Sequence, residues 1–115
     1  MTNLLFVSED WRPPVALDPR QFAIAAATGL TQMLEFVRMH PVDVVLVDKR
    51  AWNVSANTIS RWIKAVRGSV RIILLSDKLL MPYEIPGHVD AVISREAPAE
   101  LVRDTITAVL PLLEC

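Results

Sequence analysis

The sequence has 115 residues, of which 52% are hydrophobic and 22% charged, and its 12 basic and 13 acidic residues give a formal net charge of −1. This composition favours a single folded domain over residues 1–115 and argues against intrinsic disorder, because enough apolar surface is available to offset chain entropy. The nearly neutral charge, without a basic block, argues against direct nucleic-acid binding.

The cysteine content and the apolar runs indicate the compartment. Cys115 is the only cysteine, so an internal disulfide is excluded and a reducing environment is expected. No apolar run approaches the roughly 20 residues that a membrane span requires. The N-terminus shows neither a basic leader nor a small-residue cleavage site. We therefore expect a cytoplasmic protein that does not bind membranes.

The first elements of the chain are two strands and a helix. Strands are predicted over residues 3–7 and, with weaker character, 22–27. The connection between them contains Pro13, Pro14 and Pro19, so we expect an extended or turn-rich loop in place of a full crossover helix. A helix is predicted next, because apolar side chains recur with helical spacing at Leu30, Met33, Leu34 and Val37.

The middle of the chain repeats the alternation of strand and helix. Strands are predicted over residues 42–47 and 70–75, and both are apolar at nearly every position, which is typical of a parallel sheet covered on both faces. Between them a helix is predicted with Ser55 as its N-cap and an apolar stripe of Ile59, Trp62, Ile63 and Val66. Trp62 is accordingly predicted to lie in the core.

The last third of the chain adds one strand and one helix. Residues 78–88 include Pro82, Pro86 and Gly87, so any helix there is brief or irregular. A strand is predicted over residues 89–93, followed by a helix that begins at Pro98 and ends before Pro111. The alternation of strands and helices predicts an α/β domain with a parallel sheet and right-handed crossovers.

The order and spacing of these elements resemble the receiver domain of two-component response regulators, which has a flavodoxin-like (CheY-like) fold. The resemblance extends over nearly the whole chain and is best in FAIAAATGLTQMLEFVRMHPVDVVLVDKR and VRIILLS. It implies a five-stranded parallel sheet of order 2-1-3-4-5, here with the first crossover helix missing or much shortened. It also implies that Asp48 occupies the phosphoacceptor position and Ser76 the switch position.

The resemblance further implies a Mg²⁺ site at the acceptor. Receivers bind the cation with an acidic pair after the first strand together with the acceptor aspartate. The matching positions in this chain are Ser8 and Glu9, so one carboxylate is lost, although Asp10 follows directly. Glu9, Asp10 and Asp48 are therefore the candidate metal ligands, and Mg²⁺ is the cofactor if the chain is phosphorylated.

The chain departs from the receiver pattern at other phosphate-binding positions. Ser94 and Arg95 occupy the phosphate-contact positions where receivers carry a lysine and a cis proline. Lys49 and Arg50 follow Asp48, and such cations compete with Mg²⁺. The pattern is similar to that of pseudo-receivers, which signal through protein contacts without regulated phosphotransfer. In the alternative interpretation of Asp48, the carboxylate is a solvated acid paired with Lys49, Arg50 or Arg95.

The predicted loss of the first helix indicates a protein partner. In a receiver-like sheet the first and last helices together cover one face, so its loss should uncover apolar side chains beside the last helix. A second copy of the chain or a partner helix would then fill the gap; alternatively, Val15 and Leu17 fold over it. Two loop tryptophans near the carboxyl edge are predicted either to fold down as a lid or to contact a partner. The interface candidates are Trp11, Trp52, Leu101, Thr105 and Val109.

The leading functional hypothesis is a pseudo-receiver that is not an enzyme, needs no cofactor and acts in signal transduction by binding another protein. The alternative is a phosphoaccepting receiver with Mg²⁺-dependent phosphorylation of Asp48. A third hypothesis, a small enzyme of another flavodoxin-like family, ranks lowest, because the segment SEDWRPP after the first strand lacks phosphate-cradling glycines.

Overall fold

Five parallel strands form one sheet in the order β2-β1-β3-β4-β5, as the resemblance implied. The structure is a computed structural model that describes residues 2–8, 17–48, 55–76 and 87–110. The strands are β1 (Thr2–Val7), β2 (Phe22–Ala27), β3 (Val44–Asp48), β4 (Arg71–Ser76) and β5 (Ala91–Ser94). The flavodoxin-like topology predicted for the chain is confirmed.

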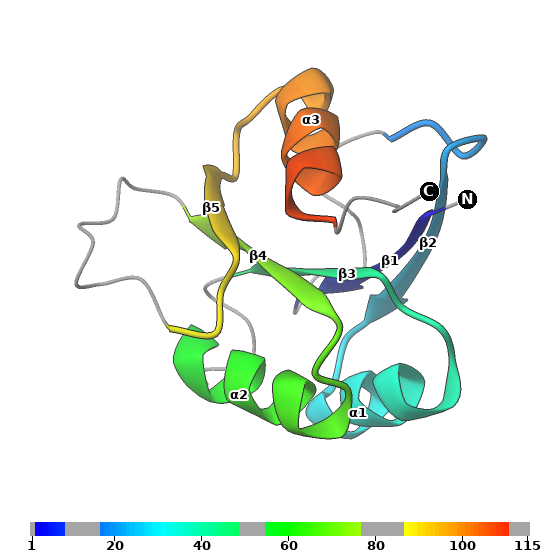
Figure 1. Cartoon of the computed structure of the whole chain (residues 1–115), viewed down its shortest axis with the longest axis vertical. Coiled ribbons are helices and arrows are strands. Elements are labelled where there is room, and N and C mark those ends of the chain that lie inside the picture. The colour runs from blue at the N-terminus through cyan, green and yellow to red at the C-terminus, as the bar shows by residue number, and fades with distance from the viewer. Residues whose placement is uncertain (1, 9–16, 49–54, 77–86, 111–115) are drawn as a thin grey trace, which may run out of the picture.

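Helices cover both faces of this sheet. Within the described ranges they are α1 (Leu30–Met39), α2 (Ala56–Val66) and α3 (Ala99–Val109). Helices α1 and α2 lie together on one face, and α3 lies on the other (Figure 1). Ser55 is the N-cap of α2, as predicted, and its hydroxyl accepts the Thr58 N–H at 3.1 Å. None of the helices in these ranges is long and apolar enough to span a membrane.

The core is divided into two layers by the sheet. Leu5, Val45 and Ile63 belong to the layer under α1 and α2, whereas Leu46 and Ile106 belong to the layer under α3. Successive strand residues point to opposite faces, so adjacent residues of one strand feed different layers. Every residue of β3 is buried. This confirms that the central strands are covered on both faces.

The prediction that Trp62 lies in the core is wrong. Its side chain is 38% exposed, whereas Ser60 is fully buried. Ile59 and Ile63 point into the core. At about 100° per residue, Ser60 and Trp62 lie at equal angles on opposite sides of the direction of these two side chains, so the neighbouring elements, and not the helical spacing, decide which flank is buried. The apolar stripe in the sequence is therefore wider than the face that α2 buries.

The described part of the connection between β1 and β2 is a turn. The Asp18 carbonyl accepts the N–H groups of Gln21 and Phe22 at 3.0 and 3.1 Å. Leu17 packs against the core layer under α3, which agrees with the alternative that the loop folds over this face. Val15, the other residue of that alternative, lies outside the described residues.

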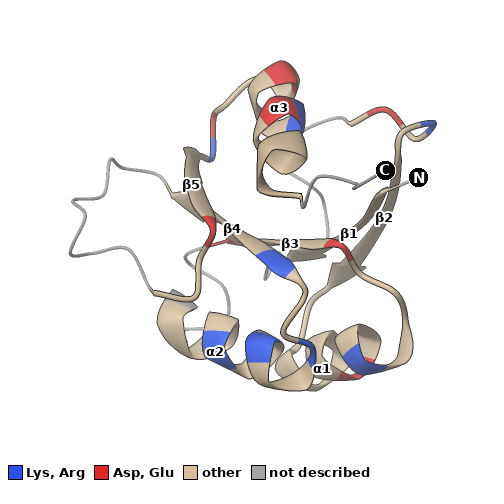
Figure 2. Ribbon diagram, viewed as in Figure 1, with Lys and Arg blue, Asp and Glu red and all other residues tan. Residues whose placement is uncertain are grey.

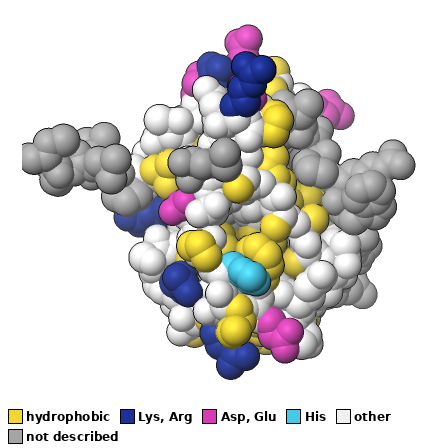
Figure 3. Space-filling view, turned by 90° about the vertical axis from the view of Figure 1, so that its right-hand side faces the viewer, with side chains coloured by type: hydrophobic (Ala, Val, Ile, Leu, Met, Phe, Trp, Pro, Cys, Tyr) yellow, Lys and Arg dark blue, Asp and Glu magenta, His cyan; other side chains and the backbone are white. Residues whose placement is uncertain are grey.

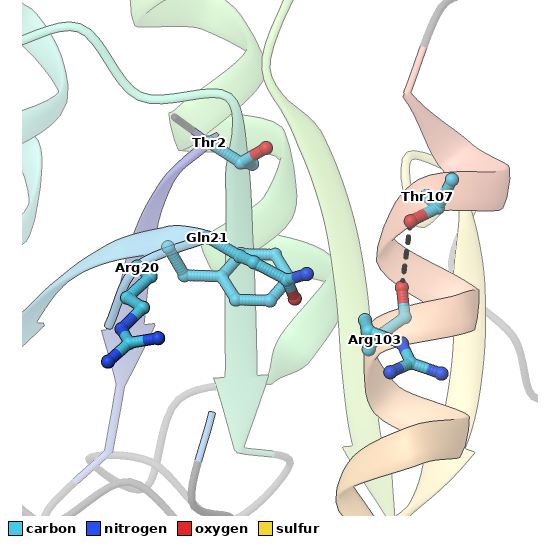
Figure 4. Close-up of a pocket in the computed structure, with 6 residues that line it drawn as sticks. Thr2, Arg20, Gln21, Arg103 and Thr107 are labelled. Atoms are coloured by element: carbon cyan, nitrogen blue, oxygen red, sulfur yellow. Dashed lines mark hydrogen bonds between the residues drawn. The ribbon is translucent and has the colours of Figure 1, made fainter. Parts of the chain in front are cut away.

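A groove remains between this turn and α3. Its volume is about 410 Å³, and Figure 4 shows Gln21 on one side of it and Arg103 on the other. The Thr107 hydroxyl, on the same wall, donates to the Arg103 carbonyl at 3.1 Å. Most of the lining side chains are polar; the full set is Thr2, Arg20, Gln21, Phe22, Arg103 and Thr107. The groove is thus mainly polar, and whether a helix is missing beside it depends on residues 9–16, which lie outside the described residues.

Two large apolar side chains are exposed on this half of the molecule. Ile24 of β2 is 38% exposed and Leu101 of α3 is 47% exposed. On the side of the molecule that carries β2, the hydrophobic side chains of the described residues form small groups separated by polar atoms (Figure 3). Single exposed apolar side chains are common on monomers, and the broad apolar patch expected from the sequence stays a prediction, because the residues that would border it include ones outside the described ranges.

Candidate functional site at the carboxyl edge of the sheet

The ends of four parallel strands bring the predicted site residues to one edge of the sheet. Ser8 follows β1, Asp48 ends β3, Ser76 ends β4 and Ser94 ends β5. In the ladder, Asp48 pairs with Leu75, and Ser76 pairs with Ser94. Because open parallel sheets bind ligands outside their carboxyl edge, this is the place where chemistry is expected.

Asp48 is buried and held by an arginine. Its side chain is 5% exposed, and its Oδ2 atom accepts a hydrogen bond from Nη2 of Arg95 at 2.5 Å. The same oxygen accepts from the Ser8 hydroxyl at 3.3 Å. The sequence predicted Arg95 as one possible partner of Asp48, and this pairing is confirmed. The prediction that the carboxylate is solvated is wrong, because the ends of the neighbouring strands bury it. The contact with Ser8 was not predicted, although Ser8 had been placed at the first position of the acidic pair.

The turn after β5 fixes Arg95 in place. The backbone N–H of Arg95 donates to the Ser76 carbonyl at 2.9 Å, so the chain stays paired with β4 for one residue beyond the strand. The Arg95 side chain, 20% exposed, then reaches across β4 to Asp48 of β3. A guanidinium keeps its charge at all ordinary pH values and has donors only, so it balances the carboxylate permanently.

Ser94 and Ser76 occupy different environments. Ser94 is exposed, and its hydroxyl accepts the N–H of Glu96 at 3.1 Å, which closes the turn that leads to α3. Ser76 is buried, with 1% of its surface exposed, beside Asp48 and Arg95. Of the two predicted phosphate-contact positions, Arg95 therefore contacts the acceptor position, whereas Ser94 stabilises a turn.

The described residues fit a Mg²⁺ ion poorly. A hard cation needs several oxygen ligands, and no group of three or more His, Cys, Asp or Glu that could hold a metal occurs among the residues that the structure describes. Oδ2 of Asp48 already faces the fixed positive charge of Arg95. The other predicted ligands, Glu9 and Asp10, lie outside the described residues, so the full ligand set stays a prediction.

The interface candidates are only partly within the described chain. Leu101 is exposed, whereas Thr105 and Val109, one and two turns further along α3, are half-buried. The Thr105 hydroxyl donates to the Leu101 carbonyl at 2.8 Å, and Val109 packs against the core layer under α3. Trp11 and Trp52 lie outside the described residues, as do Lys49 and Arg50. The role of all five candidates as interface residues stays a prediction.

Comparison with known protein families and with curated proteins gives no match for this sequence. Comparison with solved structures does give matches. A response regulator from Thermotoga maritima in complex with Mg²⁺ and BeF has 15% identity and a TM-score of 0.73, with 96% of this chain and 100% of that chain covered. A two-component response regulator from Clostridium difficile has 12% identity and a TM-score of 0.77, with 95% of each chain covered.

A third solved structure carries a different name. It is described as an adenylate cyclase from Rhodopirellula baltica, with 15% identity, a TM-score of 0.76, and coverage of 93% of this chain and 85% of that chain. At such identities a likeness establishes the fold and not the activity. The chain therefore has the CheY-like fold of response-regulator receiver domains.

Proposed function

We propose that this chain is a receiver-like signalling domain that acts by contact with another protein and does not undergo regulated phosphotransfer. The observation that carries this proposal is the ion pair between Asp48 and Arg95 at the position where receivers accept phosphate. The fold supports a signalling role, and the state of the acceptor position supports the absence of phosphotransfer.

The chemistry of aspartyl phosphorylation explains why this ion pair matters. A carboxylate oxygen of the aspartate must attack phosphorus and form the new O–P bond, while the bond from phosphorus to the leaving group breaks. Mg²⁺ normally offsets the charge of the phosphoryl oxygens. In this chain a guanidinium binds Oδ2 of Asp48, lowers the electron density available for attack and repels a divalent cation.

The proposal includes a cytoplasmic domain without a catalytic site or a resident cofactor. The single cysteine supports a reducing compartment. The absence of glycines in SEDWRPP supports the lack of a catalytic site, because a flavodoxin-like enzyme normally binds phosphate groups through glycines at that loop. The cyclase name of one solved structure belongs to that protein and gives no residue of this chain a catalytic role.

The second candidate function is the phosphoaccepting receiver. It is favoured by one observation, which is that Asp48 and Ser76 lie together at the buried carboxyl edge of adjacent strands. In this case the guanidinium of Arg95 would have to leave Oδ2 and contact the phosphoryl oxygens.

Intact-mass measurement after incubation with acetyl phosphate and Mg²⁺ separates the two functions. We expect no phosphoryl adduct on the chain, under conditions in which a phosphorylatable response regulator is fully modified. An adduct that disappears in Asp48→Asn would overturn the proposal and establish the second function. Arg95→Lys is the informative companion, since it supplies an amine at a position that contacts Asp48.

A second copy of the chain is one candidate for the partner, at the face of α3. Leu101 is exposed there, and Thr105 and Val109 continue its stripe along the helix. Sedimentation over a range of concentrations tests this. A mass that rises with concentration in the native chain and stays monomeric in Leu101→Glu would support a homodimer, and a strict monomer would direct the search to another protein.

A further inference from the structure

A second surface lies on the opposite side of the sheet from α3. A hollow of about 280 Å³ lies between α1 and α2, and all of its lining residues are apolar: Leu34, Trp62, Ala65 and Val66. We call it the α1–α2 groove. The two helices that form it lie side by side at the bottom of the molecule in Figure 1.

The core of the protein is closed without Trp62, Ala65 and Val66, whereas Leu34 is half-buried and packs against the core. Met33 and Val37 of α1 and Ile59 and Ile63 of α2 are fully buried and fill the space between these helices and the sheet. Trp62, in contrast, is 38% exposed, and Val66, one turn further along, is 40% exposed. A tryptophan that is exposed beside other apolar side chains offers a large contact area, and tryptophan is enriched among the residues that dominate binding energy.

Cationic side chains surround the α1–α2 groove. Arg38 lies one turn beyond Leu34 on α1, and Arg61 lies one turn before Ala65 on α2, so each shares a helix face with a groove residue. Nη2 of Arg67 donates to the Arg38 carbonyl at 3.2 Å, which holds a third guanidinium between the ends of the two helices. Figure 2 shows basic residues along both helices.

Acidic residues balance few of these cations. Lys64 of α2 forms an ion pair with Asp90 at 3.4 Å, so its charge is balanced. Glu35 is the one acidic residue within α1 and α2. Among the described residues no carboxylate forms an ion pair with Arg38, Arg61 or Arg67. The rim of the groove therefore carries a net positive charge.

From this arrangement we propose that the α1–α2 groove binds an amphipathic helix of another protein, whose apolar side chains enter the groove and whose acidic side chains contact the arginines of the rim. A groove between two helices is a common acceptor for a third helix, which anchors through residues spaced three and four apart. The volume is at the lower limit of small-molecule pockets, roughly 300–1,000 Å³, and fits one or two side chains better than a whole ligand.

The charge of the rim also disfavours a second copy as the occupant. In a two-fold dimer the same surface contacts itself, so the arginine-bearing rim of one copy would lie against the rim of the other. Like charges facing each other across an interface are unfavourable. The partner is therefore a different protein with an acidic surface. This proposal does not depend on whether Asp48 accepts phosphate.

Fluorescence anisotropy with two synthetic peptides tests the proposal on the full chain. The first peptide is a fluorescein-labelled helix with leucines at i, i+3, i+4 and i+7 and glutamates on the flanking positions. The second is identical except that lysines replace the glutamates. We expect the acidic peptide to bind, with an affinity that falls as salt increases, and the basic peptide to bind at least tenfold more weakly.

Variants locate the binding site. We expect Trp62→Ser to weaken binding of the acidic peptide at least tenfold and Arg61→Glu to weaken it several-fold, because these changes remove the apolar anchor and reverse a rim charge. Ile24→Ser, on the α3 side of the sheet and, like Trp62, 38% exposed, is the matched control and should leave binding unchanged. Circular dichroism of each variant establishes that the fold is retained.

Three outcomes would overturn the proposal. They are an acidic peptide that does not bind, equal binding of both peptides, and binding that is lost in Ile24→Ser but kept in Trp62→Ser. Self-association of the chain that disappears in Trp62→Ser would also overturn it, because a second copy would then occupy the groove. Failure of the phosphotransfer proposal affects none of these results, since the α1–α2 groove and the Asp48 site share no residue.

Discussion

Arg95 has a structural role, whether or not Asp48 accepts phosphate. Its guanidinium lies against a carboxylate that is almost completely removed from solvent, since the side chain of Asp48 is 5% exposed. A buried charge needs a partner, because an ion without one keeps its desolvation cost. The intact pair therefore adds little to the free energy of unfolding, whereas removal of either member lowers it substantially.

Substitution of Arg95 by alanine should destabilise the chain by roughly 2–3 kcal/mol, since it leaves the Asp48 carboxylate buried with one charged hydrogen bond fewer. The figure is at the lower end for buried pairs because Arg95 is 20% exposed. Urea denaturation followed by circular dichroism measures this. The matched control is Arg103→Ala, which removes an exposed ion pair with the adjacent Asp104 and should change stability by less than about 0.5 kcal/mol. Equal effects of the two changes would show that the Asp48 ion pair contributes nothing.

The residues of the site could be predicted from the sequence better than their contacts. Asp48 and Ser76 directly follow apolar runs, and the carboxyl ends of parallel strands meet at one edge, so their shared location was predictable. The contact between Arg95 and Asp48 could not be derived from the sequence, which offered Lys49 and Arg50 as partners equally well. It depends on the path of the turn after β5, which is set by the hydrogen bond from Arg95 N–H to the Ser76 carbonyl.

At the scale of the element, helix α2 contains two serines with opposite energetic roles. Ser55 caps the helix and satisfies the Thr58 N–H. Ser60 is fully buried, and its hydroxyl is a buried polar atom that lacks a hydrogen-bond partner within the described chain. A cap hydroxyl stabilises a helix, whereas an unsatisfied buried hydroxyl keeps its cost of desolvation.

The same substitution at these two positions should therefore have opposite effects. Ser55→Ala should lower the free energy of unfolding by about 1 kcal/mol, because an orphan N–H of the first turn loses its acceptor. Ser60→Ala should raise it by roughly 0.5–1.5 kcal/mol, because the buried hydroxyl is removed while the backbone is unchanged. Thermal and urea unfolding of the two variants provide the comparison, with each variant serving as the control for the other. A destabilised Ser60→Ala would mean that this hydroxyl is satisfied in solution.

The limits of the elements differ from the prediction for a physical reason. The apolar runs predicted strands over residues 42–47 and 70–75, but the ladders begin at Val44 and Arg71 and end at Asp48 and Ser76. Val42 and Val70 are buried in the core although they precede the strands. Hydrophobicity therefore reports burial, whereas strand pairing depends on backbone hydrogen bonds that polar residues form equally well. Trp62 was misplaced because periodicity identifies an apolar face but not its buried width.

The whole molecule consists of one sheet between two separate core layers. The alternation of strands and helices predicted the fold class, but the strand order came from the family resemblance, because alternation alone allows several orders. Ile63 of α2 and Ile106 of α3 are both fully buried, one in each layer. The sheet contributes to both layers, since adjacent residues of each strand point to opposite faces. Loss of either layer should therefore destabilise the sheet on which the other depends.

This dependence predicts a single cooperative unfolding transition in which the layers contribute independently to stability. Ile63→Val and Ile106→Val should each lower the free energy of unfolding by roughly 0.5–1.5 kcal/mol, since each removes one buried methyl group. The free energy of unfolding of the double variant should fall by the sum of the two single effects to within about 0.5 kcal/mol, because the two side chains belong to different clusters and share no packing partners there.

Urea denaturation followed by circular dichroism gives the three values, and amide hydrogen exchange in α1 and α3 tests whether both helices unfold in the same transition. Leu101→Val, at an exposed position of α3, is the control and should change stability by less than about 0.5 kcal/mol. Exchange in α3 that accelerates in Ile106→Val while exchange in α1 keeps its native rate would contradict this, because it would mean that α3 detaches from the sheet before the rest of the domain unfolds.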